Sequence, residues 1–174
     1  MSVYIGVDAG GTKTAAAVAD GDRVLARSVG PPGAVRPGRA LHAASRIAVV
    51  VRRALTDAGL LQGDVLVVGA AGAGRDPERS ELREMLRAER LAERTLVTGD
   101  LDVAFEAAFG AGSGIVLVSG TGSVAIARTP DGTLLRAGGL GWQIGDEGSG
   151  YAIGRAALAA VGRARDGRGA ATGL

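Results

Sequence analysis

The chain has 174 residues, of which 47% are hydrophobic, 22% charged and 3% aromatic, and its formal net charge is +2. The 20 basic and 18 acidic residues are scattered along the chain, and with so few aromatic side chains this argues against a nucleic-acid surface. No cysteine occurs in the sequence, which excludes disulfides, thiolate zinc sites and cysteine-bound iron–sulfur clusters within it.

Glycine and the N-terminus give two further expectations. The chain contains 30 glycines among 174 residues, more than twice the usual share of about 7%. This excess predicts many turns and close backbone approaches. The N-terminus starts directly as a strand, without a charged and apolar leader, and no apolar run reaches the length of a membrane span. We therefore expect a cytoplasmic protein that does not contact a membrane.

The first part of the chain predicts a three-stranded meander and then alternating helices and strands. Apolar runs at residues 3–8, 14–19 and 24–29 predict the meander, with a glycine turn after its first strand. Residues 38–59 repeat apolar side chains at steps of three and four, which predicts a helix with one buried stripe. That stripe contains Leu41, Ala44, Ala48, Val51, Leu55 and Ala58.

A continuous apolar run at residues 65–71 predicts a parallel strand that is buried on both faces. After it, Asp76 and Pro77 can cap and open a helix that extends to about residue 90. A strand at residues 95–98 and a helix at residues 101–110 complete this part.

The opening pattern then returns. A buried strand at residues 114–119, a glycine turn, and strands at 124–128 and 133–137 predict a second meander, and a helix at 150–164 follows. We therefore predict an α/β protein with a duplicated architecture, in which residues 1–112 form a first lobe and residues 113–174 the beginning of a second, incomplete lobe.

Residues 8–14, DAGGTKT, place a carboxylate at a strand end before two glycines, two hydroxyls and the lysine. Backbone amides of such a turn can approach a phosphate, and a carboxylate there can hold Mg²⁺ through water. An ordinary hairpin turn is the alternative. The candidate phosphate-binding residues are Asp8, Gly10, Gly11, Thr12, Lys13 and Thr14, with Asp8 as the Mg²⁺ ligand.

A second glycine turn, SGTGS at residues 119–123, also follows a predicted strand. Two such turns can hold the β- and γ-phosphates of one nucleotide, because phosphoryl transfer depends mainly on positioning and charge neutralisation. The candidate residues here are Gly120, Thr121, Gly122 and Ser123.

Asp100 directly follows a predicted strand and precedes a helix. A carboxylate in that place can act as the general base for a hydroxyl acceptor, and a helix N-cap is the alternative. We interpret Asp102 as a solvated acid in the first turn of the helix, favoured by the helix dipole.

The glycine-rich segment at residues 138–155 predicts an ordered loop before a helix that Ser149 caps. Trp142 could pack on a sugar ring, and Asp146 and Glu147 could accept hydrogen bonds from sugar hydroxyls. A structural turn with a buried tryptophan is the alternative. His42, the single histidine, is interpreted as structural, since it lies beside the apolar stripe of its helix and has no partner for a metal site.

Five segments occur in an order that resembles the N-acetylglucosamine kinase and BadF/BadG/BcrA/BcrD-type ATPase family. They are DAGGTKT at 8–14, GAAGAGR at 69–75, Asp100, SGTGS at 119–123 and GGLGWQIGDEGSGYAIG at 138–154. The resemblance implies a duplicated ribonuclease-H-like, actin-like ATPase fold with ATP and Mg²⁺ between its lobes. It also implies phosphoryl transfer from ATP to a sugar hydroxyl, most naturally of an amino sugar such as N-acetylglucosamine.

The resemblance assigns roles to individual positions. It implies that Asp8, Gly10, Gly11 and Thr12 form the first phosphate segment and that Thr121 and Gly122 form the second and also contact the substrate. It makes Asp100 the base and Asp146 a ligand of the sugar hydroxyls. The expected partners are a small sugar and ATP, and a homodimer is an open alternative.

Two features limit these expectations. The loop at residues 30–38, GPPGAVRPG, lacks the asparagine that animal sugar kinases of this kind carry there, so the loop is the place to look for substrate specificity. The short second lobe favours an alternative, a truncated fragment or regulatory ATPase-like module that binds a sugar or phosphate without catalysis. The lack of cysteine argues strongly against two related groups, the iron–sulfur activators and the zinc-containing sugar repressor/kinases.

Overall fold

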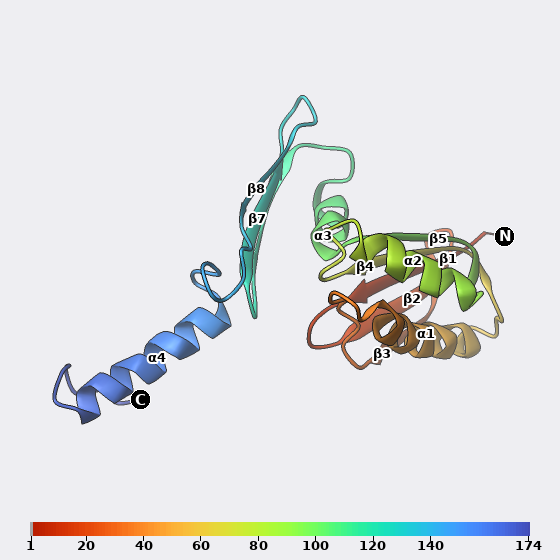
Figure 1. Cartoon of the computed structure of the whole chain (residues 1–174). Coiled ribbons are helices and arrows are strands. Elements are labelled where there is room, and N and C mark those ends of the chain that lie inside the picture. Colours follow the sequence, from red (N-terminus) through yellow and green to blue (C-terminus); the bar gives the residue numbers. More distant parts are fainter. Residues whose placement is uncertain (1) are drawn as a thin grey trace. The chain divides into compact units, whose positions relative to one another are not determined.

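Strand β1 (Val3–Ala9) lies in the middle of a five-stranded mixed sheet (Figure 1). The computed structural model describes residues 2–174 and gives this sheet the order β3-β2-β1-β4-β5. Strands β2 (Thr14–Asp20) and β3 (Arg23–Gly30) continue from β1 as an antiparallel meander. Strand β4 (Gly63–Ala70) is parallel to β1, and β5 (Ala92–Gly99) is parallel to β4. The expected meander and the parallel strand after it are confirmed.

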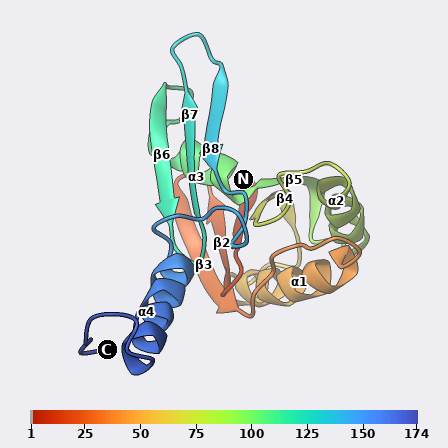
Figure 2. The same cartoon turned by 60° about the vertical axis from the view of Figure 1, so that its left-hand side comes forward.

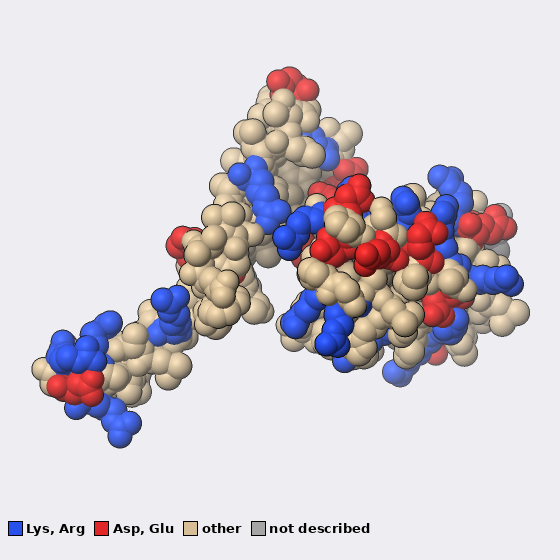
Figure 3. All heavy atoms as spheres, in the orientation of Figure 1, with Lys and Arg blue, Asp and Glu red and all other residues tan. Residues whose placement is uncertain are grey.

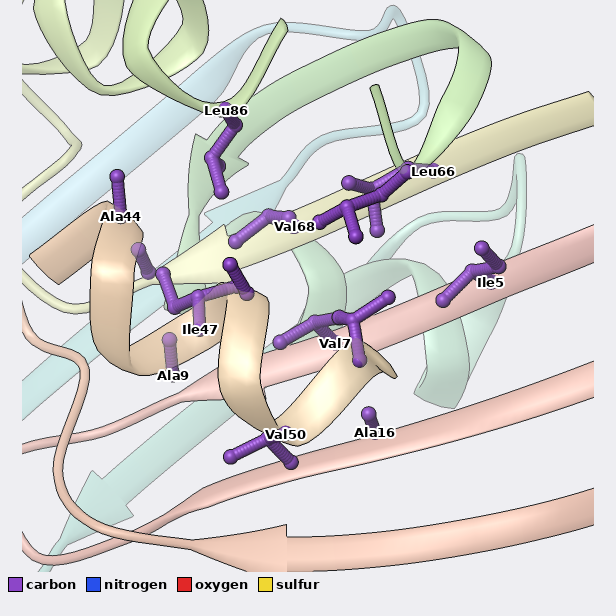
Figure 4. Close-up of a cluster of buried hydrophobic side chains, with 14 of the residues drawn as sticks. Ile5, Val7, Ala9, Ala16, Ala44, Ile47, Val50, Leu66, Val68 and Leu86 are labelled. Atoms are coloured by element: carbon purple, nitrogen blue, oxygen red, sulfur yellow. The ribbon is translucent and has the colours of Figure 1, made fainter. Parts of the chain in front are cut away.

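Helices α1 (Ala40–Asp57) and α2 (Glu78–Ala88) cover one face of this sheet and enclose its core. Ile47 of α1 lies beside Val7 of β1 and Val68 of β4 (Figure 4), and all three side chains are buried. Burial of apolar surface between helices and sheet is the main stabilising contribution to such a layer. The first unit of the chain, which ends at Ala104, therefore has a core of its own.

The opposite face of the sheet is only partly covered. Val65 and Val67 of β4 are half-buried, whereas Leu66 and Val68 on the helix-covered face are fully buried. Helix α3 (Asp100–Phe109) approaches this second face, where Val103 packs against Gly69. The expectation that β4 is buried on both faces therefore holds fully for one face only.

The second unit begins at Phe105 and contains a three-stranded antiparallel sheet and a helix (Figure 2). Strands β6 (Gly114–Ser119), β7 (Ser123–Arg128) and β8 (Leu134–Gly138) follow one another in the sheet, and α4 (Gly150–Arg165) comes after them. This is the second meander that the sequence predicts. The lobe boundary expected between residues 112 and 113 stays a prediction.

The second unit has little buried interior. Ile115 of β6 is 71% exposed, and helix α4 contains no buried residue. Most of the visible surface of this sheet is uncharged (Figure 3). The expectation that a buried strand precedes the second glycine turn is therefore wrong, because α4 leaves the faces of the small sheet open.

Two details of the helices differ from the sequence analysis. Leu41 is exposed, because the buried stripe of α1 runs through Ala43, Ala44 and Ile47 instead. Asp76 does not cap α2: its carboxylate accepts a hydrogen bond from the Ser80 hydroxyl (2.8 Å) and pairs with Arg79. The Ser80 hydrogen bond and the Arg79 guanidinium lower the pKa of Asp76.

The predicted cap of the last helix is confirmed, since the Ser149 hydroxyl accepts a hydrogen bond from the Ala152 amide (3.1 Å). Within residues 2–174 we find no helix with the length and apolarity required to cross a lipid bilayer.

Replacing Leu66 tests the assignment of the core to the first unit. Leu66 is fully buried and Leu61 is 98% exposed. We expect Leu66→Ala to lower the free energy of unfolding by about 2–5 kcal/mol, because it leaves a cavity beneath the helices. Leu61→Ala is the matched control, with an expected change below about 0.5 kcal/mol. Urea denaturation measures both, and equal effects would contradict the assignment.

Candidate functional site

Three parallel strands of the first unit end at the same edge of its sheet. Ala9 of β1 pairs with Ala70 of β4, which pairs with Gly99 of β5. The segments that follow these strands are the DAGGTKT turn, residues 71–75 and the start of α3. In open α/β sheets ligands bind outside the carboxyl ends of the strands. We call this edge, with those three segments, the carboxyl edge.

The DAGGTKT turn offers open space and unengaged polar groups at the carboxyl edge. Asp8 is exposed, and no hydrogen-bond or ion-pair partner of its carboxylate is found among residues 2–174. A Cβ atom added to Gly11 would meet no other atom within 4 Å, so a ligand can approach the backbone there. Thr12 and Lys13 are also exposed. These features fit a phosphate group close to the turn.

Thr14 differs from its neighbours in this turn. Its side chain is completely buried, and its hydroxyl donates a hydrogen bond to the Pro31 carbonyl oxygen (2.7 Å). The single hydroxyl hydrogen is thus already used, so Thr14 cannot donate to a phosphate. Thr14 instead fixes the loop that leads from β3 to α1.

That loop, residues 31–39, is bound by its backbone to both neighbouring turns. The Ala34 amide donates to the Gly10 carbonyl (3.2 Å), and the Val35 amide donates to the Ala71 carbonyl (2.9 Å). Gly72 has φ +89° and lies so close to Val35 that an added Cβ would be 2.1 Å from the Val35 carbonyl oxygen. Only glycine fits this position. The DAGGTKT turn, the 31–39 loop and the GAAGAGR motif therefore form one structure.

Asp100 is the first residue of α3 and is half-buried at the carboxyl edge. Its Oδ1 accepts a hydrogen bond from the Leu101 amide (3.0 Å). A helix N-cap accepts from the second or third helical residue instead, so this geometry differs from the N-cap alternative. Within the described chain its Oδ2 atom has no hydrogen-bond donor. One carboxylate oxygen is thus left for a ligand.

Asp102 holds the corner at which Asp100 lies. Its Oδ2 accepts hydrogen bonds from the Gly99 amide (3.1 Å) and from the Thr98 hydroxyl. The side chain is exposed in the first helical turn, as expected, but it also fixes the end of β5. The sequence analysis missed this positioning role. An acid three residues after the strand's last residue is the signal that could have indicated it.

In the second unit the SGTGS turn and the 146–150 segment bind each other. Asp146 is buried, and its Oδ1 accepts a hydrogen bond from the Ser123 amide (3.2 Å). The Ser123 hydroxyl donates to the Glu147 carbonyl (2.7 Å), and the Gly150 amide donates to the Gly120 carbonyl (2.8 Å). A Cβ at Gly122 would lie 2.9 Å from Asp146 Oδ2. The structure therefore brings Gly120, Gly122, Ser123 and Asp146 together, and leaves Thr121 exposed.

The surroundings of two other candidate residues, Trp142 and His42, differ from those expected from the sequence. Trp142 is 55% exposed and packs against the Tyr151 ring (5.3 Å between centroids), so the buried-tryptophan alternative is wrong. His42 is exposed and lines a hollow with three arginines, so it does not pack beside the apolar stripe of α1. The arginines of this hollow were not recognised from the sequence.

The chain is similar to known sugar kinases over nearly its whole length. The sequence model of the BadF/BadG/BcrA/BcrD ATPase family matches residues 5–173. An N-acetylmuramic acid/N-acetylglucosamine kinase of Clostridium acetobutylicum is 31% identical over 99% of this chain and 57% of its own length. An N-acetyl-D-glucosamine kinase of Dictyostelium discoideum is 31% identical over 99% of this chain and 58% of its own length.

Solved structures are also similar to it. A protein from Chromobacterium violaceum, assigned as an N-acetylglucosamine kinase, has a TM-score of 0.83 at 28% identity and covers 99% of this chain and 61% of that one. A ROK hexokinase from Thermus thermophilus has a TM-score of 0.62 at 25% identity, over 92% of this chain and 64% of that one. The α/β fold with a mixed sheet is thus shared, and the chain spans less than two thirds of the length of these relatives.

Replacing Thr14 tests how the 31–39 loop is held. We expect Thr14→Val, which keeps the shape and removes the hydroxyl, to lower the free energy of unfolding by about 1 kcal/mol, because the Pro31 carbonyl loses its donor. Thr12→Val, at an exposed position in the same turn, is the control for stability. Thermal and urea unfolding measure the difference. A Thr14→Val protein as stable as the control would contradict the structural role.

Proposed function

Because the chain belongs to the BadF/BadG/BcrA/BcrD ATPase family, we propose that it forms the phosphate-binding and sugar-binding part of an ATP-dependent kinase. That kinase phosphorylates a hydroxyl of an amino sugar. The proposal rests on one observation: Asp100 and the DAGGTKT turn lie at the same carboxyl edge, on either side of residues 71–75. The named substrates of the two curated relatives, N-acetylglucosamine and N-acetylmuramic acid, support an amino sugar.

Asp100 is the proposed general base. Its carboxylate takes the proton of the sugar hydroxyl, and the hydroxyl oxygen attacks the γ-phosphorus of ATP. The bond from that phosphorus to the bridging oxygen then breaks, and ADP leaves with the electron pair. Asp102 acts through Asp100 as a positioning residue, because it holds Thr98 and Gly99 immediately before it.

The phosphate groups are assigned to the two glycine turns. In the first unit the proposed contacts are the backbone at Gly10 and Gly11 and the side chains of Thr12 and Lys13. In the second unit they are Gly120, Thr121, Gly122 and Ser123. The open space at Gly11 and Gly120, where an added Cβ would meet nothing within 4 Å, supports close approach of a ligand to the backbone.

Asp8 is the proposed ligand of Mg²⁺, through water. Within residues 2–174 there is no cluster of three or more candidate metal-ligating side chains. Magnesium in phosphoryl-transfer sites is commonly held by one or two carboxylates together with phosphates and water, so the single exposed carboxylate fits it. When bound, Mg²⁺ would offset the negative charge of the phosphates.

The sugar is assigned to Asp100, Thr121, Gly122, Trp142 and Asp146. Asp146 has one carboxylate oxygen engaged by the Ser123 amide, which fixes its orientation and leaves the other available. The exposed ring of Trp142 offers an apolar face to a sugar. These assignments follow the family motifs.

We further propose that the units correspond to two lobes of a duplicated ribonuclease-H-like fold, with the boundary between residues 112 and 113. The matching meanders support this: β1–β2–β3 and β6–β7–β8 are both antiparallel, and a small-residue turn follows the first strand of each. A cytoplasmic location and a homodimer stay predictions.

A second candidate function is binding without catalysis. The exposed apolar side chains of β6 and α4 favour it, because a unit with so little core is expected to open locally more readily than the first. In this case the chain would bind sugar or phosphate and release no ADP.

Replacing Asp100 tests the proposed chemistry. We expect the chain to release ADP in the presence of N-acetylglucosamine and Mg·ATP, and Asp100→Asn to lower kcat by about 10²–10⁴-fold with sugar binding retained, because the asparagine cannot accept the proton. A coupled ADP assay measures turnover and calorimetry measures binding. Asp57→Asn, an exposed acid at the end of α1, is the matched control.

The outcomes separate the two candidate functions. Unchanged turnover in Asp100→Asn would remove Asp100 from the role of base. Sugar binding without ADP release by the unaltered chain would instead favour the binding module.

A further inference from the structure

A hollow of about 320 Å³ lies beside the carboxyl edge of the first unit, and no role has yet been assigned to it. It opens between the 31–39 loop and the first turns of α1. The residues that line it are Gly11, Pro32, Ala34, Arg36, Arg39, His42 and Arg46. We call it the arginine hollow. Figure 3 shows basic side chains at the end of the first unit where α1 begins.

The charge of the arginine hollow is of one sign. Three of its lining residues are arginines, which stay protonated in proteins, and none is acidic. Within residues 2–174, neither Arg36 nor Arg39 forms a salt bridge. Arg46 donates one hydrogen bond to the Pro32 carbonyl (3.0 Å), which holds it against the loop. Guanidinium groups that share a hollow without a carboxylate are suited to bind an anion.

Helix α1, whose first turns border the hollow, adds to this excess of positive charge. The first turn of α1 contains no acidic residue, and no side chain caps it. The N-terminal end of a helix carries partial positive charge and is stabilised by acidic side chains, whereas α1 has Arg39 there. This arrangement is unfavourable in the free protein. A negatively charged ligand group in the hollow would offset it.

The position of the hollow connects it to the proposed active site. The loop that forms one wall is bound to Gly10 and to Ala71, and Gly11 of the phosphate turn is itself a lining residue. A substrate held at the carboxyl edge can therefore extend one substituent into the hollow. Its volume is near the lower end of small-molecule sites, which suits a substituent of a sugar.

We propose that the arginine hollow binds the carboxylate of an acidic amino sugar and so makes the kinase prefer it to a neutral one. This inference rests on the proposed function. Arg36 and Arg39 are the specificity-determining residues, because they are exposed in the hollow and have no other ionic partner in the described chain. A phosphate of the nucleotide has similar chemistry. The sugar carboxylate is favoured because six of the seven lining residues come from the loop and α1, and only Gly11 from the phosphate turn.

Two sugars that differ by one substituent test the proposal. N-acetylmuramic acid is N-acetylglucosamine with an added lactyl ether, which carries a carboxylate. Calorimetry on the unaltered chain is expected to give at least about tenfold tighter binding of N-acetylmuramic acid, since a hydrogen bond to a charged group is stronger than a neutral one. This preference should shrink as salt is added, because the hollow is open to solvent.

Removal of the charge tests the named residues. Arg36→Gln and Arg39→Gln are each expected to reduce the preference for N-acetylmuramic acid by about tenfold. Arg46 is not used, because its loss would also release the Pro32 carbonyl. Arg53→Gln is the matched control: Arg53 is an exposed arginine of α1 outside the hollow. It should leave the preference unchanged.

Each of the following three outcomes would contradict the inference. Equal affinity for the two sugars, or an equal loss of both in the arginine variants, would exclude the carboxylate site while leaving the proposed kinase intact. Weakened binding of Mg·ATP alone would assign the hollow to the nucleotide instead. Binding of neither sugar would contradict the proposed function as well.

Discussion

Parallel pairing of β1 with β4 and of β4 with β5 is the constraint on which the site of the first unit depends. It brings the ends of three strands to one edge, although the segments that follow them are far apart in the sequence. Burial of Ile47, Val7 and Val68 between helix and sheet stabilises this pairing. Asp100 and the DAGGTKT turn therefore lie at the same edge, on either side of residues 71–75.

Hydrogen bonds to backbone groups then determine the shape of the edge. The 31–39 loop is held at Pro31, Ala34 and Val35 by three different partners, which tie it to the turns after β1 and β4. The same device orders the glycine motifs of the second unit, where Ser123 and Asp146 join two segments that have almost no apolar core around them. Polar contacts and not burial keep those motifs together.

Local patterns made much of this predictable from the sequence. The strands and helices follow from the periodicity of the apolar residues, and the Ser149 cap follows from a serine placed directly before a helix. The family motifs name the residues of the candidate site. What could not be predicted depends on packing between distant segments. The exposure of Leu41 follows from which side of α1 meets the sheet, and the burial of Thr14 follows from the path of the 31–39 loop. The basic wall formed by Arg36, Arg39 and Arg46 needs a folded loop beside a helix, so the scattered arginines gave no signal of it.

Sugar binding at the carboxyl edge is tested most directly by the amide NMR spectrum of the chain titrated with N-acetylglucosamine. The predicted result is shifted signals at residues 10–13, 31–42, 71–75 and 99–102 of the first unit and at residues 119–123 and 138–150 of the second unit, with the other signals unchanged. Shifts at the opposite ends of the strands, near residues 60–63 and 90–92, with none at the carboxyl edge, would contradict it.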